Sequence, residues 1–368
     1  MRRRHYLVVV MALLCLVLVS LAGCGGSGEQ QGDQTPATDA SDALAALEPV
    51  KMTLASDVPA NPLDHQHSAA VAFKNYVEEK SGGKISVEIN AGGALGDLEA
   101  LMEQTIQGTV EASIGHTEGN LSIVFPDIQV ISIPYLFRSV DQAMYVFEGP
   151  FGQKLHEDFR TKTGARIVAF WDNGGFRNFT NSVREIRTPA DLKGLKMRTM
   201  QIPAHIEMMK ALGATPTPIS FSELYSALDT GVVDGEENAI PTFLVINLQE
   251  VQKYMTLDGH LYSMMYMVIN DQWLQELPKP YQDIITEGGV QSGLTGARMC
   301  RVTRETGIDT MKNAGMQIYQ PTADELQLFK DATQNKVLDF IKKELEHPEL
   351  VDDIITESNK AAKEFGYN

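Results

Sequence analysis

Short apolar runs alternate regularly with amphipathic stretches of helical period from Val50 onward. Apolar residues occupy every second position in residues 85–91, a period that predicts a strand, while residues 67–79 before them have the period of a helix. The alternation continues through predicted strands at 50–55, 111–115, 165–171, 176–180 and 196–200 and predicted helices at 96–107 and 203–212. This order predicts an α/β fold with parallel sheets and helices on both faces.

A long helical pattern near the C-terminus indicates a molecule larger than a single lobe. Residues 278–313 contain hardly a helix breaker apart from glycines, and they predict one helix that is longer than a single domain diameter. Two further amphipathic helices are predicted at 330–345 and 350–365. A chain of 368 residues at 43% hydrophobic can bury more than one core. We therefore expect two lobes that the long helix bridges.

The N-terminal segment has the pattern of a secretory signal. Three arginines precede an apolar run that is too short to span a membrane, and the run ends at Leu21-Ala22-Gly23-Cys24. These four residues resemble the lipobox of bacterial lipoproteins. We predict a signal peptide at 1–23, a diacylglycerol anchor on Cys24, and a flexible tether up to residue 47, because the composition there is polar and lacks aromatic residues. An ordinary signal peptide with an incidental cysteine is the alternative.

The charge of the chain restricts its partners. The formal net charge is −17, and removal of residues 1–23 with their three arginines would bring it to −20, that is, −17 − 3. Nucleic-acid binding requires clustered Lys and Arg that neutralise phosphates, and the sequence after residue 50 has no such cluster. If the protein binds an anion, the attraction must come from a few arginines and backbone amides that face inward. The composition therefore excludes nucleic acid as a partner.

The sequence carries none of the short motifs that mark common catalytic sites. It lacks Cys-x-x-Cys, His-Glu-x-x-His, a Walker loop and a Gly-x-Ser-x-Gly elbow. His65 and His67 diverge at a helix start and do not predict a metal site. Cys300 is a single thiol in a helical pattern, which is typical of a small buried hydrophobe, and His260 is typical of a hydrogen-bonded histidine in a core or cleft. We predict no cofactor, no metal ion and no catalytic residue.

Four blocks in the centre of the chain resemble one family. They are Asp191-Leu-Lys-Gly-Leu-Lys-Met-Arg198, Leu212-Gly-Ala-Thr-Pro-Thr-Pro218, Phe221-Ser-Glu-Leu-Tyr-Ser-Ala-Leu228 and Gly231-Val-Val-Asp-Gly-Glu-Glu-Asn238. In order and spacing they are similar to the dicarboxylate-binding (DctP) solute-binding proteins of tripartite ATP-independent periplasmic (TRAP) transporters. The resemblance extends from about Val50 to the C-terminus.

The resemblance implies a two-lobed fold of the periplasmic-binding-protein type (class II), with the long helix spanning the hinge. Lobe I would comprise residues 48–173 and 264–302, and lobe II residues 174–263 and 303–368. The protein would act outside the cytoplasm, where it would capture a small organic acid and deliver it to the membrane permease subunits. The acid could be a C4-dicarboxylate, a sugar acid, a 2-oxo acid or an aromatic acid.

The resemblance also assigns site residues. Arg198 matches the arginine that forms a bidentate pair with the ligand carboxylate, which the two parallel donors of a guanidinium permit and a lysine does not. Arg177 matches a second arginine that is directed at the ligand, and Asn238 matches an asparagine that donates to the carboxylate. Phe221 matches an aromatic residue that packs on the ligand body, and His116 matches a pocket position whose residue type varies.

Two alternatives would use the same cleft. An extracellular lyase acting on an organic acid would need a base near the carboxylate. A ligand sensor would present the closed form to a receptor domain instead of a permease.

Overall fold

The computed structural model describes residues 44–367, so the predicted signal peptide, Cys24 and most of the predicted tether lie outside the described residues. Nine strands in this part of the chain form one sheet with the order β2-β1-β3-β8-β4-β7-β5-β6, and β9 pairs with β8. The strands are β1 (Val50–Ala55), β2 (Ile85–Asn90), β3 (Ala112–His116), β4 (Ala165–Asn181), β5 (Lys196–Thr199), β6 (Thr215–Pro218), β7 (Gly235–Asn238), β8 (Tyr254–Asn270) and β9 (Gln317–Tyr319).

The sheet is parallel at both ends and antiparallel in the middle. β1 pairs in parallel with β2 and β3, and β5 pairs in parallel with β6 and β7, as the alternation predicts. The two central strands β4 and β8 run antiparallel to each other and to their outer neighbours β7 and β3. The prediction of parallel sheets is therefore wrong for the centre, where two long strands join the parallel ends.

β4 is one strand of 17 residues where the sequence predicts two. Gly174 and Gly175 look like a break, but they form an irregularity at which the register with β8 shifts between Asp172 and Phe176. Both glycines have positive φ, +88° and +91°, which other residues adopt only with strain. A Cβ on Gly174 would also lie 2.3 Å from Cδ of Pro241. The glycines therefore bend the strand without ending it.

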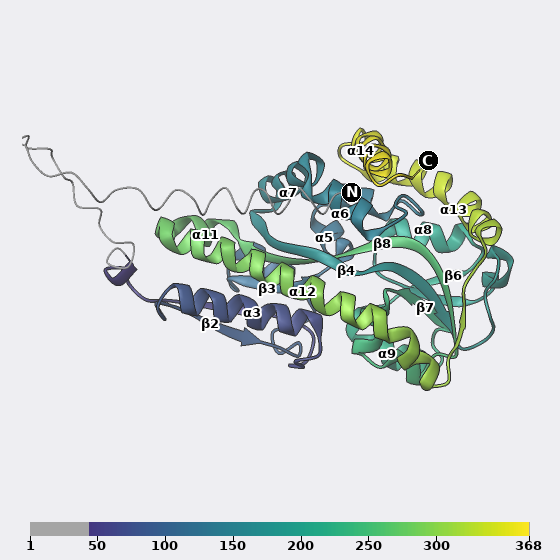
Figure 1. Cartoon of the computed structure of the whole chain (residues 1–368), viewed down its shortest axis with the longest axis horizontal. Helices are drawn as coiled ribbons and strands as arrows, with labels where there is room; N and C mark the ends of the chain where they lie inside the picture. The colour runs from purple at the N-terminus through teal and green to yellow at the C-terminus, as the bar shows by residue number, and fades with distance from the viewer. Residues whose placement is uncertain (1–43, 368) are drawn as a thin grey trace, which may run out of the picture. The chain divides into compact units, whose positions relative to one another are not determined.

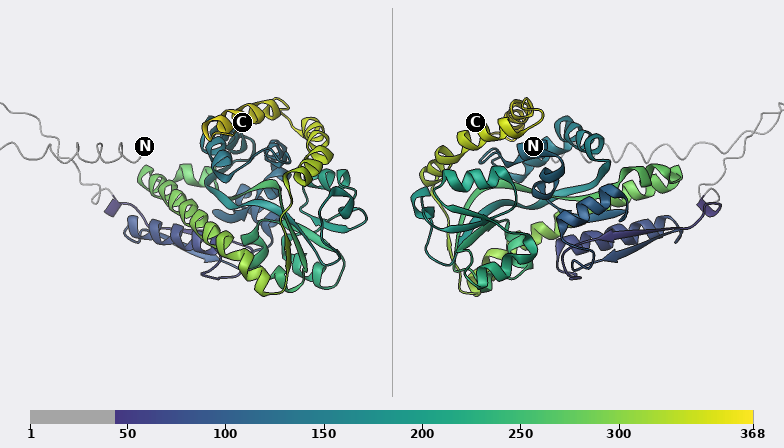
Figure 2. Two further views of the ribbon diagram at one scale, coloured as in Figure 1. Left: turned by 45° about the vertical axis from the view of Figure 1, so that its right-hand side comes forward. Right: turned by 180° about the vertical axis from the view of Figure 1, so that it is seen from behind.

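Helices cover both faces of the sheet, as predicted (Figures 1 and 2). The α-helices are α3 (His65–Lys80), α4 (Leu98–Gln107), α5 (Glu118–Val124), α6 (Val140–Glu148), α7 (Pro150–Thr163), α8 (Pro203–Ala211), α9 (Leu224–Asp229), α10 (Ile240–Val245), α11 (Asp271–Glu276), α12 (Lys279–Asn313), α13 (Ala323–Glu344) and α14 (Leu350–Glu364). Short 3-10 helices are η1 (Pro126–Ser132), η2 (Pro189–Leu192), η3 (Phe221–Glu223) and η4 (Leu248–Glu250).

The long helix α12 contains 35 residues and runs across β4 (Figure 1). Its glycines allow the two backbones to approach closely. A Cβ on Gly289 would lie 2.1 Å from the carbonyl oxygen of Val168, and one on Gly296 would lie 2.5 Å from the ring of Trp171. The glycines that lower the helix propensity of this segment are thus required by its packing.

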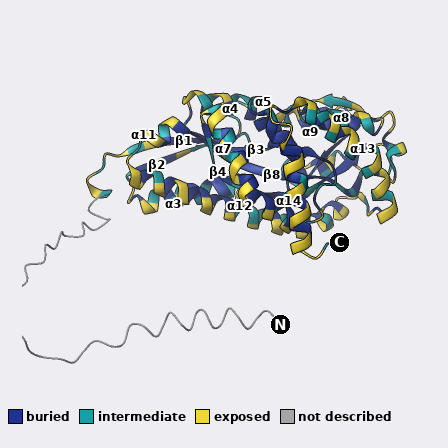
Figure 3. Ribbon diagram, turned by 90° about the horizontal axis from the view of Figure 1, so that it is seen from above, coloured by how far each residue is buried: buried dark blue, intermediate teal, exposed yellow. Residues whose placement is uncertain are grey.

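Strand alternation divides the core between the two faces of the sheet. Met265 and Met267 of β8 belong to the apolar cluster under α3 and α12, whereas Met264 and Tyr266 belong to the cluster on the other face. Cys300 is fully buried in the first cluster, as predicted. Figure 3 shows the strands buried between helices whose outer surfaces are exposed.

The folded body begins before the predicted boundary at residue 48. Leu44 and Leu47 pack against the cluster under α3, and Nζ of Lys84 donates to the carbonyl oxygens of Ala45 (3.0 Å) and Leu47 (2.8 Å). Residues 44–47 therefore contact the body, because two leucines can bury apolar surface there. Among the described residues, the structure contains no helix whose length and apolar character would suffice to cross a membrane.

Candidate functional site

A cavity lies where the parallel strands of both sheet ends terminate. It has about 670 Å³ of empty volume, part of which is open to solvent. Asp57 follows β1, Thr117 follows β3, and Gln201 follows β5, so the carboxyl ends of the strands meet there. Open α/β sheets bind ligands at this edge. Four predicted site residues line the cavity: Arg177 of β4, Arg198 of β5, Phe221 of η3 and Asn238 of β7.

Arg198 presents a buried guanidinium without an anionic partner. Its exposed fraction is 2%, and its Nε donates to the carbonyl oxygen of Ile219 at 2.9 Å. Within residues 44–367 no carboxylate forms an ion pair with it. Burial lowers the pKa of Arg198 to about 10, so the group is still charged at neutral pH. A buried charge without a partner is costly, and a ligand carboxylate would supply the missing partner.

Arg177 also lines the cavity, but its charge is already paired. Its Nε and Nη2 donate to the carboxylate of Glu237, the latter at 3.0 Å, and Nη2 also donates to the Glu237 carbonyl oxygen at 2.6 Å. Both side chains are almost completely buried. Burial would lower the pKa of Arg177, but the charge of Glu237 outweighs it and the pKa is raised. The structure therefore separates the two arginines into one that is paired and one that is not.

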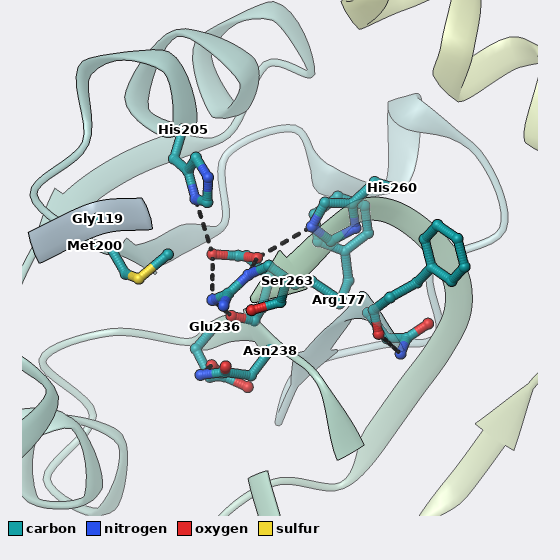
Figure 4. A network of polar contacts seen from close by, with 12 residues as sticks. Gly119, Arg177, Met200, His205, Glu236, Asn238, His260 and Ser263 are labelled. Atoms are coloured by element: carbon teal, nitrogen blue, oxygen red, sulfur yellow. Dashed lines mark hydrogen bonds and ion pairs between the residues drawn. The ribbon is translucent and has the colours of Figure 1, made fainter. Parts of the chain in front are cut away.

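Two histidines approach the same carboxylate from other sides (Figure 4). His205 Nδ1 lies 3.4 Å from Glu237 Oε1, and His260 Nε2 lies 3.1 Å from Oε2. His260 Nδ1 is 2.8 Å from Oδ2 of Asp258. Burial alone would lower the pKa of His260, but Asp258 and Glu237 raise it to about 9. Glu237 is thus the centre of a buried charge network behind the cavity wall.

Asn238 is held toward the cavity by a second buried acid. Its Nδ2 donates to Oε2 of Glu236 at 3.0 Å, and the Thr180 hydroxyl donates to Oε1 of Glu236 at 3.1 Å. Burial and the charge of Glu237 raise the pKa of Glu236 to about 7. Glu236 therefore orients the amide of Asn238, which is 3% exposed and lines the cavity.

His116, which the sequence predicts as a pocket residue, is not among the residues that line the cavity. Its neighbours Gly115 and Thr117 line the cavity, whereas His116 is fully buried with its Nε2 2.8 Å from the Ser113 hydroxyl. Consecutive strand residues face opposite sides, which explains the difference. Burial lowers the pKa of His116 to about 3, so the ring is neutral.

Sequence reasoning missed several cavity residues. Asp57, Gln66 and Glu99 line the cavity, and Glu237 and His205 support it from behind. Asp57 could have been found, because it follows a predicted strand at the edge where ligands bind. Glu237 lies in the block Gly231–Asn238, in which the resemblance assigns only Asn238 to the site. In the described part of the chain no three His, Cys, Asp or Glu side chains are grouped to hold a metal ion.

Comparison with protein families gives a match over residues 56–344 to the model of bacterial extracellular solute-binding protein, family 7 (DctP). The chain is 31% identical over 282 residues to the 2,3-diketo-L-gulonate-binding periplasmic protein YiaO of Escherichia coli, covering 77% of this chain and 84% of that protein. It is 31% identical over 263 residues to the C4-dicarboxylate-binding protein DctB of Bacillus subtilis, covering 70% and 73%.

Among solved structures, the chain is similar to the sugar acid binding protein DctPAm of Advenella mimigardefordensis in complex with galactonate. The TM-score is 0.80 at 28% identity, and the match covers 86% of this chain and 99% of that one. This similarity confirms the predicted α/β fold of two-lobed class II binding proteins with a long hinge helix, which here is α12.

Proposed function

The chain belongs to the bacterial extracellular solute-binding proteins of family 7, the DctP proteins of TRAP transporters, and we propose that it captures a small organic acid through Arg198 and delivers it to the membrane permease. The observation that carries this proposal is the buried, unpaired guanidinium of Arg198 in the cavity wall. A carboxylate can accept two parallel hydrogen bonds from it, and such charge-assisted pairs are the strong ones. The family is not enzymatic, so the lyase alternative is set aside.

The supporting residues give Arg198 a defined role. Glu237 fixes the position of the Arg177 side chain in the cavity wall. Asn238 adds an amide that Glu236 orients. Phe221 is a partly buried ring in the same wall, suited to contact the ligand body. These groups favour an anionic end of the ligand beside Arg198.

α5 contacts the residues that follow β5 beside the cavity, and we propose that this contact marks the closed arrangement. A Cβ on Gly119 would lie 3.0 Å from Cδ1 of Ile202 and 3.1 Å from Sδ of Met200. The Thr117 hydroxyl lies 3.6 Å from the same sulfur. The predicted lobe boundary near β4 residues 172–175 and β8 residues 263–265 would separate these partners. Ligand would then favour closure because only the closed form surrounds it.

Binding of an organic acid tests the proposal. In a thermal-shift screen of C4-dicarboxylates, sugar acids, 2-oxo acids and aromatic acids, at least one acid should raise the melting temperature and bind with one-to-one stoichiometry. The bound acid should be recovered chemically unchanged, and the protein should copurify with permease subunits. Binding of no acid, or recovery of a converted product, would contradict the proposal. Copurification with a receptor domain instead would identify a sensor.

We further propose that Cys24 carries the lipid that holds the protein at the outer face of the membrane. The proposal rests on the apolar run and on the sequence Leu21-Ala22-Gly23-Cys24. Replacing Cys24 by serine should move the protein from the membrane fraction to the soluble extracytoplasmic fraction, because the thiol that accepts the lipid is gone. Fractionation and mass measurement of the mature N-terminus check this. Retention of the variant on the membrane would rule the anchor out, and Cys300→Ser, at a buried thiol, serves as the control.

A further inference from the structure

The part of the cavity wall that comes from β1, α3 and α4 is built differently from the part around Arg198. Asp57, Gln66, Asp97 and Glu99 line it, and the described lining contains no cation other than Arg177 and Arg198. Both arginines come from the other side of the sheet order, from β4 and β5. One side of the cavity is therefore cationic and the other is rich in hydrogen-bond acceptors.

Two of these acceptors have no hydrogen-bond partner within residues 44–367. Oε1 of Gln66 is buried without a hydrogen bond, and the exposed fraction of this residue is only 3%. Oδ1 of Asp57 is likewise buried without a hydrogen bond. Gln66 Oε1 lies so close to Gly115 that a Cβ there would be 2.4 Å from it, which means that the glycine makes room for this amide. Unsatisfied buried acceptors are costly, so a bound ligand that donates hydrogen bonds would relieve them.

The charge of this wall determines which groups of a ligand can bind beside it. Burial is the main cause that raises the pKa of Asp57 to about 7, and the nearby carboxylates of Glu99, Asp64 and Asp97 add to it. Glu99 Oε1 already accepts from Asn120 Nδ2 at 3.2 Å. A second carboxylate on the ligand would meet three acidic side chains and no unpaired cation here. Hydroxyl groups would instead donate to the unpaired oxygens.

We infer that Asp57 and Gln66 determine specificity, and that they select a polyhydroxylated acid with a single carboxylate over a dicarboxylate. The inference rests on the proposed function, because it assumes that Arg198 holds the carboxylate. Similar proteins in the family include both a C4-dicarboxylate-binding protein and a sugar acid binding protein, so membership alone does not make this choice. In this chain, the unpaired acceptors of Asp57 and Gln66 favour the hydroxylated acid over the dicarboxylate.

Matched sets of acids test the inference by calorimetric titration. The four-carbon set is erythronate, butyrate and succinate, and the six-carbon set is galactonate, hexanoate and adipate. One of the two hydroxylated acids should bind at least about 100-fold more tightly than the other acids of its set, because a site built to bond hydroxyls discriminates strongly against analogues without them. A dicarboxylate or an alkanoate that binds as tightly as its hydroxylated counterpart would overturn the inference, and so would an amino acid that binds more tightly than either hydroxylated acid.

Variants separate this inference from the proposed function. Asp57→Ala and, independently, Gln66→Leu should each weaken binding of the hydroxylated acid by about 10-fold or more while leaving the alkanoate unchanged. Glu103→Gln removes an exposed acid of α4 that does not line the cavity, and it should change nothing. If Arg198→Ala lost all acid binding while both wall variants kept the selectivity of the wild type, the proposed function would stand. The role of Asp57 and Gln66 in selectivity would then be refuted. Absence of any acid binding in the wild type would refute both.

Discussion

Replacing Arg198 by alanine is expected to abolish the rise in melting temperature that the true ligand produces, with a loss of affinity of at least about 100-fold. The guanidinium donates one hydrogen bond to Ile219 and has no ion pair with any described residue, so its remaining donors are available for a carboxylate. Lysine at the same position should restore only part of the affinity, because an ammonium group cannot make the bidentate contact. Thermal shift and titration calorimetry on the same preparations measure both effects.

The free protein provides a control for this prediction. Removal of an unpaired buried charge should not lower the unfolding free energy of the ligand-free protein, so lost binding would not reflect lost folding. Arg301→Ala is the matched surface variant, since that side chain is 73% exposed and pairs with Glu305 one helical turn away. An unchanged ligand response in the Arg198 variant would show that another group binds the acid.

Replacing Glu237 by glutamine is expected to lower the unfolding free energy by about 3–5 kcal/mol. The change leaves Arg177 buried without its carboxylate and removes the anion that His205 and His260 approach. Burial would raise the pKa of Glu237, but Arg177 and the two histidines lower it well below its usual value, so the native carboxylate is charged. Denaturant unfolding measures the loss, and it should be accompanied by weaker ligand binding because Arg177 would no longer be fixed in the wall.

Two comparisons make this second prediction specific. Glu157→Gln removes an ion pair with Arg160 in which the acid is 58% exposed, and it should cost less than about 1 kcal/mol. Combining Glu237→Leu with Arg177→Met should recover much of the stability, since removing both buried charges avoids the uncompensated one. If Glu237→Gln were no more destabilising than Glu157→Gln, the buried network would not have the role assigned to it.

Much of the local structure could be predicted, and the failures have physical causes. Strand and helix periods place β1, α3, β2 and α12 within a few residues. The helix predicted to start at residue 330 starts at Ala323, where Thr322 and Glu325 form a capping box that the sequence contains. The sequence predicts two strands where the structure has β4, and Gly174 and Gly175 lie between them, but pairing with β8 continues on both sides of these glycines.

In the candidate site, too, some residues could be predicted from the sequence and others could not. Arg198 and Asn238 could be assigned because they stand in blocks similar to a known family, and their positions in the chain carry that information. Whether His116 faces the cavity depends on which face of β3 meets the cavity, and the order of residues does not state this. Asp57 and Gln66 could not be recognised as unpaired acceptors, since that property depends on every group around them.

The periodic elements, the long helix and the membership of a solute-binding family follow from the amino-acid sequence, because these are properties of neighbouring residues or of ordered motifs. The folded molecule is needed to show that Arg177 is paired with Glu237, that Arg198 has no carboxylate partner within residues 44–367, and that a wall of acceptors faces the two arginines. Charge pairing and desolvation depend on distances between groups that lie far apart in the chain. Arg177 and Glu237, for example, are 60 positions apart in the sequence.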